Sequence, residues 1–142
     1  HREEQIKKIQ LIKEHLNLEE DSKILDIGCG PCWTTEFFDH VVGIDPAFKL
    51  LDGSKPVLNA SAENLPFQDH AFDVVMSITA AHHFDMGLAI PKMKRVGKDK
   101  FVITVLKKAN NKNNIVNLLK QNFKVTKEIE EEKDIILFLD AN

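Results

Sequence analysis

Short runs of consecutive apolar residues recur along the chain and alternate with segments of helical periodicity. The pattern predicts strands at 23–27, 41–44, 56–59, 72–76 and 101–106. These runs are largely continuous rather than alternating apolar and polar, so both faces of each strand must be covered. Helices packed on both faces of a mostly parallel sheet meet that requirement.

Helices are expected before and between these strands. An amphipathic helix over 3–17 is predicted by one apolar stripe, formed by Ile6, Ile9, Ile12 and Leu16. The other expected elements are a helix from Pro31 to Phe38, helices over 86–96 and 115–122, a helical turn at 48–51 and a polar loop at 110–114. Pro91 predicts a kink or a late start in its helix.

The last two apolar runs, 123–129 and 134–139, lie too close together for a crossover helix and must be antiparallel. We therefore expect a single domain over 1–142, with a helical segment at 1–20 and a core at 21–142. The expected fold class is α/β, with a doubly wound, mostly parallel, seven-stranded sheet that ends in a C-terminal antiparallel hairpin.

Composition is that of an ordinary globular protein, with 43% hydrophobic and 29% charged residues. No apolar run approaches the roughly 20 residues that span a bilayer, and the first residues lack a signal-peptide core. No membrane association is expected, and a cytoplasmic protein is the default. Basic residues gather between Lys92 and Lys127, where Asp99 is the one acid. Such a stretch can attract a nucleic acid, but no aromatic residues interleave with it, and a solvated face is favoured.

Cys29 and Cys32 form one C-x-x-C motif. A zinc site needs two further ligands at suitable spacing, and no second pair exists, so no metal is expected. A redox pair is one interpretation, because the motif follows a strand and opens a helix. The favoured interpretation is that both are small residues in a tight glycine turn.

The strongest local signal is a strand, a glycine turn and a helix around Gly28 and Gly30. Glycines let the backbone approach a ligand closely, and the following helix should present unpaired N–H groups to it. Asp45 ends the second strand, where its carboxylate can accept from the hydroxyls of a ribose. Trp33 stands where dinucleotide binders have a third glycine, which argues against a nicotinamide dehydrogenase. Asp26 could instead cap a turn, and Asp45 could form a turn before Pro46.

Several blocks in order resemble the class I S-adenosylmethionine-dependent methyltransferases, especially a small-molecule-like group with a Leu-Pro-Phe block. These blocks are Ile24–Gly30, Val42–Asp45, Ser61–Phe67, Phe72–Ser77 and Ala80–Phe84. The resemblance covers about residues 20–139, and it implies S-adenosylmethionine as cofactor and S-adenosylhomocysteine as product.

The resemblance also implies roles for individual residues. Asp26 would orient the methionine amino end, the loop of Gly28, Cys29 and Gly30 would lie against the cofactor, and Asp45 with Pro46 would lie at the ribose. The residues implied on the adenine side and at the fourth strand are Ser61, Ala62, Glu63 and Ser77. Cys32 and Ser61 depart from the pattern, because the family often has glycine and aspartate there.

His82 and His83 follow the fourth strand, where an acceptor would meet the methyl group. A neutral imidazole there could remove a proton from the acceptor, although one ring could pack and the other be solvated. Acceptor recognition would fall to the first helix, residues 80–90 and the loop at 107–114.

The function predicted is methyl transfer from S-adenosylmethionine, by direct displacement, to an acceptor that the sequence does not name. The short acceptor region suggests a bulky acceptor, or a partner chain or second copy that completes the pocket. The alternative is a catalytically silent, cofactor-binding module that regulates a partner protein.

Overall fold

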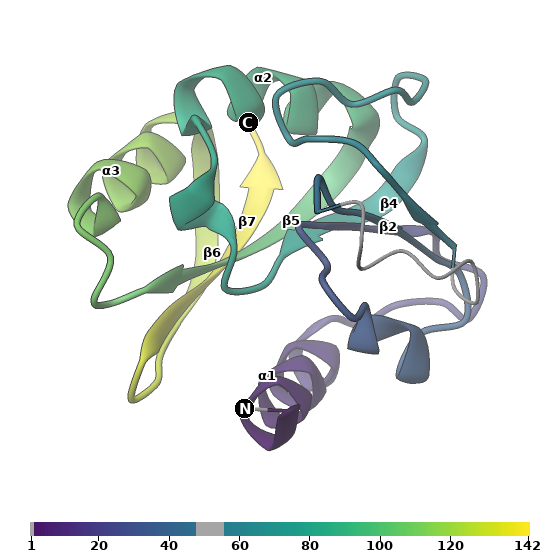
Figure 1. The fold of residues 1–142 in the computed structure, drawn as a ribbon, viewed down its shortest axis with the longest axis horizontal. Helices are drawn as coiled ribbons and strands as arrows, with labels where there is room; N and C mark the ends of the chain where they lie inside the picture. The colour runs from purple at the N-terminus through teal and green to yellow at the C-terminus, as the bar shows by residue number, and fades with distance from the viewer. Residues whose placement is uncertain (1, 48–55) are drawn as a thin grey trace.

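A seven-stranded sheet with helices on both faces is formed by residues 2–47 and 56–142, which the computed structural model describes (Figure 1). The strands are β1 (Ile24–Ile27), β2 (Val41–Ile44), β3 (Val57–Leu58), β4 (Phe72–Ser77), β5 (Gly97–Leu106), β6 (Phe123–Glu130) and β7 (Asp134–Ala141). The helices are α1 (Arg2–His15), α2 (Met86–Val96) and α3 (Lys112–Asn122), with 3-10 turns η1 (Trp33–Glu36) and η3 (Ala81–His83). The helical turn expected at 48–51 lies outside the described residues.

The strands follow the order β3-β2-β1-β4-β5-β7-β6. The first five pair in parallel, whereas β7 lies antiparallel between β5 and β6. The doubly wound sheet and its C-terminal hairpin, predicted from continuous apolar runs and a short last connection, are therefore confirmed. Because β1, β2, β4 and β5 point the same way, their carboxyl ends meet at one edge, here called the carboxyl edge.

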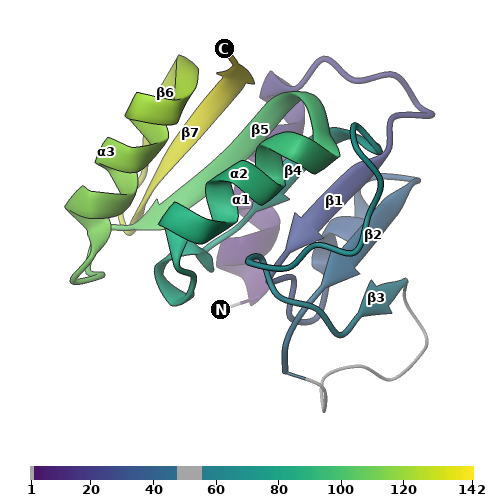
Figure 2. The same cartoon turned by 90° about the horizontal axis from the view of Figure 1, so that it is seen from above.

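Two hydrophobic clusters cover the two faces of the sheet. Figure 2 shows α2 and α3 on one face and α1 behind the other. On the first face, Phe101 and Ile103 belong to the cluster that includes the buried side of α2 and α3. On the second face, Val102 belongs to the cluster of Ile12 and Leu16 from α1. Alternate residues of β5 thus pack against opposite layers, which explains why the segment 101–103 is apolar at consecutive positions.

The helix predicted from Pro31 to Phe38 is wrong. Only the four residues Trp33–Glu36 turn, as a 3-10 helix, after Cys32 with a left-handed φ of 56°. The Thr34 side chain donates to Asp26 of β1 at 2.6 Å, so this turn is hydrogen-bonded to the edge of the sheet. A tertiary contact of this kind is invisible to local sequence pattern.

Several helix boundaries also differ from prediction. The first helix ends at His15, short of 17, and α3 begins at Lys112, so the polar loop expected at 110–114 ends earlier. Of the two alternatives that Pro91 left open, a kink or a late start of the helix, the late start is wrong, because α2 begins at Met86 behind the Asp85 cap. Proline removes one helical hydrogen bond, which the buried apolar face of α2 outweighs here. Within the described ranges, none of the helices combines the length and hydropathy that crossing a membrane requires.

Candidate functional site

The turn after β1 depends on backbone conformations that favour glycine. Gly28 and Gly30 have φ of 70° and 53°, and Cys32 adopts the same left-handed region. The two glycines differ in their surroundings. A Cβ on Gly28 would lie 2.8 Å from the Ala80 side chain, so the protein itself excludes it. A Cβ on Gly30 would meet nothing within 4 Å, which leaves open space for a ligand.

The N–H groups of this turn are engaged within the chain. Those of Gly28 and Cys29 donate to the Ile44 carbonyl at 2.8 and 3.0 Å. Gly30 donates to Oδ2 of Asp45 at 2.8 Å. The turn is therefore tied to β2 through its own N–H groups, whereas the expectation of unpaired N–H groups concerned the helix that was predicted to follow it.

Asp45 lies at the end of β2 and is buried. Its second carboxylate oxygen accepts from the Ala47 N–H at 2.7 Å, so it also forms the turn around Pro46, whose side chain is exposed. The turn-forming interpretation is thus confirmed, and the same carboxylate fixes the position of Gly30. Each carboxylate oxygen has a further lone pair, which a ribose hydroxyl could use.

Asp26 is a buried carboxyl within β1, and it accepts from the Thr34 hydroxyl. Burial raises its pKa to about 7, the Thr34 hydrogen bond lowers the pKa, and the charge of Asp45 raises it further. None of these influences is a cation. A positively charged ligand group beside Asp26 would compensate the cost of burying its charge.

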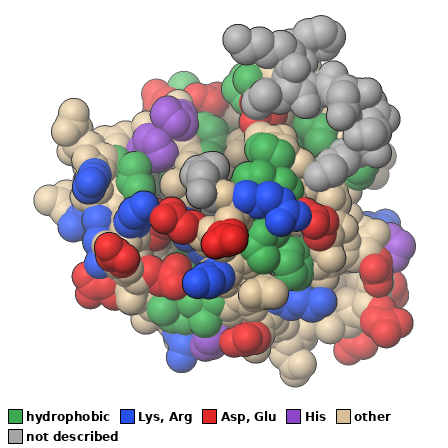
Figure 3. Space-filling view, turned by 60° about the horizontal axis from the view of Figure 1, so that its bottom comes forward, with side chains coloured by type: hydrophobic (Ala, Val, Ile, Leu, Met, Phe, Trp, Pro, Cys, Tyr) green, Lys and Arg blue, Asp and Glu red, His purple; other side chains and the backbone are tan. Residues whose placement is uncertain are grey.

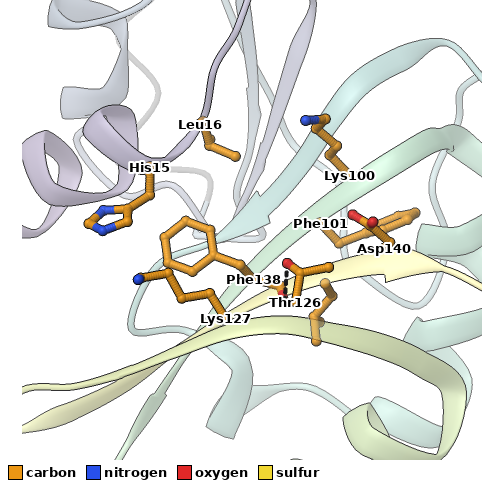
Figure 4. A pocket seen from close by; sticks show the side chains of 9 residues that line it. His15, Leu16, Lys100, Phe101, Thr126, Lys127, Phe138 and Asp140 are labelled. Carbon is orange, nitrogen blue, oxygen red and sulfur yellow. Dashed lines mark hydrogen bonds between the residues drawn. The ribbon is translucent and has the colours of Figure 1, made fainter.

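A cavity of about 30 Å³ reaches Asp26 and Gly28, and Gln5, Ile9 and Trp33 also line it. A space of this size holds about one water molecule, so a larger ligand requires these side chains to shift. Larger hollows, of about 300 and 470 Å³, lie at the opposite edge of the sheet. That edge also carries a cavity of about 90 Å³ between His15, Lys100 and Lys127 (Figure 4). We assign the site by the strand ends, because parallel sheets bind ligands at the carboxyl edge.

The two cysteines fill space between the glycine turn and β2. A Cβ on Gly43 would lie 2.5 Å from the Cys29 sulfur and 2.6 Å from the Cys32 sulfur. A hydrogen bond to Cys32 and burial raise the pKa of the Cys29 thiol, which disfavours the reactive thiolate. The geometry supports packing rather than redox chemistry. Among residues 2–47 and 56–142, no group of three or more His, Cys, Asp or Glu is placed to hold a metal ion.

The residues implied on the adenine side lie in a turn that precedes β4 in sequence and contacts the residue before α2. Ser61 bridges to Asn64, Ala62 is buried in the core, and Glu63 accepts from the Asp85 N–H at 3.2 Å. Arg95, which no sequence motif singles out, donates to the carbonyls of Leu65 and Phe67 at 2.8 and 2.6 Å. Only the tertiary fold reveals that a basic residue of α2 holds the Leu-Pro-Phe block.

Ser77 ends β4, and its side chain donates to the Ile27 carbonyl at 3.0 Å. This bond joins the carboxyl ends of β4 and β1 beside the glycine turn. The Ser77 hydroxyl therefore has a partner within the chain, and its main chain lies at the carboxyl edge.

His82 and His83 lie in η3, just beyond β4, with ring centroids 4.0 Å apart. The His83 side chain is exposed, whereas Nδ1 of His82 is buried without a hydrogen-bond partner among the described residues. Burial and then the charge of His83 lower the pKa of His82, while Asp134 acts in the opposite direction. A neutral His82 imidazole near the carboxyl edge is available to accept a proton.

The basic stretch between Lys92 and Lys127 is partly neutralised in space. Lys107 pairs with Glu130 at 2.9 Å, and Lys98 pairs with Asp73 at 3.1 Å. Figure 3 shows basic and acidic side chains interspersed over one face, with no large patch of one sign. This arrangement favours the solvated-face interpretation.

The chain is also similar in sequence to known proteins. A family profile described as "Methyltransferase domain" matches residues 25–105. An uncharacterized protein of Methanocaldococcus jannaschii is 36% identical over 112 residues, which make up 73% of this chain and 45% of that protein.

Solved structures share the fold at low sequence identity. A SAM-dependent methyltransferase of Aquifex aeolicus superposes with a TM-score of 0.78 at 17% identity, over 94% of this chain and 88% of the other. The magnesium protoporphyrin IX methyltransferase of Synechocystis, solved with bound SAM, gives 0.72 at 14% identity, over 96% and 77% of the two chains.

The chain therefore belongs to the class I S-adenosylmethionine-dependent methyltransferases, as its sheet order and the profile match both indicate. The cofactor of this family is S-adenosylmethionine. The chain spans less than half the length of the curated relatives that it matches.

Proposed function

We propose that this chain binds S-adenosylmethionine across the Asp26–Gly30 turn and Asp45, and that it methylates an acceptor held beside η3. The observation that carries the proposal is the combination of open space at Gly30 with the buried carboxyl of Asp26. No cation is among the groups that shift the pKa of Asp26. The methionine part of the cofactor offers the ammonium group that Asp26 lacks. The residues present thus fit the cofactor, which would supply an electrophilic methyl group.

Each predicted binding residue has a role in this proposal. Asp26 attracts the ammonium group, and Asp45 accepts from the ribose while it holds the Gly30 N–H. The remaining contacts would come from the main chain of Cys29 and Ser77 and from the adenine-side residues Pro46, Ser61, Ala62 and Glu63.

The acceptor would lie near His82, whose neutral imidazole can take up a proton as general base. Direct displacement needs little more from the protein than alignment of the acceptor with the methyl group, because the cofactor carries the reactivity. His83 is the weaker candidate, because its exposed ring lies in water.

Titration with S-adenosylhomocysteine tests cofactor binding. Trp33, the single tryptophan of the chain, lines the cavity at Asp26, so its fluorescence should change on binding, in parallel with calorimetry. Asp45→Ala should weaken binding at least about tenfold, because a charged acceptor is lost. Asp45→Asn, which keeps one oxygen acceptor, should lie between the two.

Asp99→Ala removes an exposed carboxylate at the start of β5 and serves as the matched control. Failure of the wild type to bind S-adenosylhomocysteine would contradict the proposal. Equal affinity of folded Asp45→Ala and wild type would contradict the role of Asp45.

We further propose that another chain, a second copy, or a further part of a longer chain completes the acceptor side. Few elements are available there among the described residues, and the match covers less than half of each of these curated relatives. A monomer fully active on a small free metabolite would overturn this view. The alternative, a silent regulatory module, predicts S-adenosylhomocysteine binding without methyl transfer to any of a broad acceptor panel, and a partner that co-purifies stably.

A further inference from the structure

Four polar residues from separate elements are joined by hydrogen bonds and an ion pair near the carboxyl ends of β4 and β5: Lys8, Thr79, Thr104 and Asp134. Together with His82 of η3, whose pKa is lowered by burial and raised by the charge of Asp134, we call them the acceptor-side cluster. Lys8 of α1 forms a buried ion pair with Oδ2 of Asp134 and donates to the Thr79 hydroxyl at 2.8 Å. The Thr79 N–H donates to Thr104 at 2.6 Å. These bonds hold Thr79 at a φ of 53°, which a threonine rarely adopts.

The cluster lies at the same edge as the proposed cofactor site. Asp134 is the first residue of β7 and pairs with Leu106, the last residue of β5. Lys8 stands between Gln5 and Ile9 on α1, and those two residues line the cavity that reaches Asp26. The cluster is therefore a neighbour of the methionine end of the cofactor site.

Two atoms of the cluster lack a partner among the described residues. They are Oδ1 of Asp134, whose side chain is only 4% exposed, and Nδ1 of His82. Native proteins seldom leave buried polar atoms unpaired, so each such atom calls for an explanation, which a bound molecule supplies. Asp134 also influences the pKa of His82, so the two groups lie within electrostatic reach of each other.

The charges around His82 define what can bind. Lys8 and Asp134 neutralise each other, and His83 is the neighbour on η3. From the start of α3, the Asn111 side-chain amide donates to the His82 carbonyl at 3.2 Å. A cationic ligand would bring an unbalanced charge into this pair, so a neutral group with hydrogen-bond donors fits better.

We propose that the acceptor-side cluster binds the neutral primary amine of the methyl acceptor, with one N–H donating to Oδ1 of Asp134 and the other to Nδ1 of His82. Two unpartnered acceptor atoms match two N–H donors, whereas a hydroxyl offers one. This arrangement requires the His82 tautomer with its hydrogen on Nε2. The proposed binding of an amine rests on the proposed function.

The chemistry balances without a further reactant. The nitrogen lone pair forms the new C–N bond as the methyl C–S bond breaks, and that electron pair stays on sulfur. The methylated ammonium then passes one proton to Nδ1 of His82. Asp134 contacts the amine and also favours the imidazolium that forms.

Aniline and phenol test the proposal, because they match in shape, are both mainly neutral at neutral pH, and differ in the number of donors. The protein is saturated with S-adenosylhomocysteine, and the His82 ring signals are followed by NMR during titration. Aniline should shift these signals saturably, and phenol should bind at least about tenfold more weakly. Asp134→Asn should weaken aniline binding by a similar factor and lower the pKa of His82.

His82→Gln, read by aniline calorimetry, covers the case in which Asp134→Asn fails to fold. His40→Gln, at an exposed histidine, is the control and should bind aniline like the wild type. Absence of a saturable shift with aniline, equal affinity for phenol, or unchanged affinity in folded Asp134→Asn or His82→Gln would overturn the proposal. Since S-adenosylhomocysteine binding is measured first, its failure would instead overturn the proposed function.

Discussion

Burial of the Asp26 carboxyl makes its protonation depend on whether the chain is folded. Its pKa rises from an ordinary value of 3.8 to about 7, chiefly because of burial. The folded protein thus binds this proton more tightly than the unfolded chain does. Stability therefore falls as the pH rises from about 4 to about 7, and the full loss persists above that range.

Asp26→Asn should remove this fall. Without ligand, the variant should exceed the wild type in free energy of unfolding at pH 8 by up to about 4 kcal/mol, and the two should converge near pH 4. Urea denaturation across this pH range measures the difference. The same variant should bind S-adenosylhomocysteine more weakly, and a pH-independent difference in stability would contradict the interpretation.

Gly28 and Gly30 should respond differently to alanine, although both have positive φ. Gly30→Ala should cost about 1–2 kcal/mol, from the left-handed backbone alone. Gly28→Ala should cost roughly 1–3 kcal/mol more, because its Cβ meets Ala80 and Phe84. Denaturation curves measure both costs. Equal costs would contradict the packing described, and Gly30→Ala should show the larger loss of cofactor affinity relative to its loss of stability.

At the scale of elements, a buried ion pair attaches α1 to the sheet. Lys8→Met would leave Asp134 buried and unpaired, and it should lower the free energy of unfolding by about 3–5 kcal/mol. Lys7→Met, at the exposed neighbouring position, should stay within about 0.5 kcal/mol of the wild type. Combining Lys8→Met with Asp134→Leu should recover most of the loss. A cost below about 1 kcal/mol for Lys8→Met would show that the pair does not fasten the helix.

An element could be predicted from the sequence when its stabilisation comes from a local pattern, and not when it comes from a contact with a distant element. The strand Val41–Ile44 matches its predicted bounds, because a continuous apolar run is a local signal of a covered strand. The turn at Trp33–Glu36 could not be predicted, because Thr34 is used by Asp26 of another element. The position of Lys8 was one indication in the sequence of a buried lysine. It stands four residues before Ile12 and therefore lies on the apolar stripe of the first helix. Its partner, Asp134, is not apparent from the local sequence.

At the scale of the whole molecule, the cofactor side of the site was more predictable than the acceptor side. Asp26, Gly28, Gly30 and Asp45 stand close to one glycine turn, so spacing alone indicated a shared edge. The acceptor-side cluster joins residues from the first helix and the last strand, and only the folded sheet brings them together. The cofactor contacts of the individual residues remain predictions.

The distribution of charge over the surface determines how strongly the protein can bind a nucleic acid. Pairs such as Lys120 with Glu128 and Arg95 with Asp69 offset the basic stretch. We expect affinity for a 20-nucleotide single-stranded RNA to be no tighter than the roughly 10⁻⁴–10⁻⁶ M typical of non-specific binding at physiological salt. Fluorescence anisotropy measures it. Nanomolar binding would restore the nucleic-acid interpretation.

The sulfur atoms packed over Gly43 have an evolutionary consequence. Any side chain at position 43 would collide with those at 29 and 32, so a larger residue can enter β2 only if the turn loses bulk. The three positions are therefore coupled, and single substitutions at 43 should be selected against in chains that keep both cysteines. A glycine at position 32 alone would not remove this coupling, because the Cys29 sulfur would still lie 2.5 Å from a Cβ at position 43.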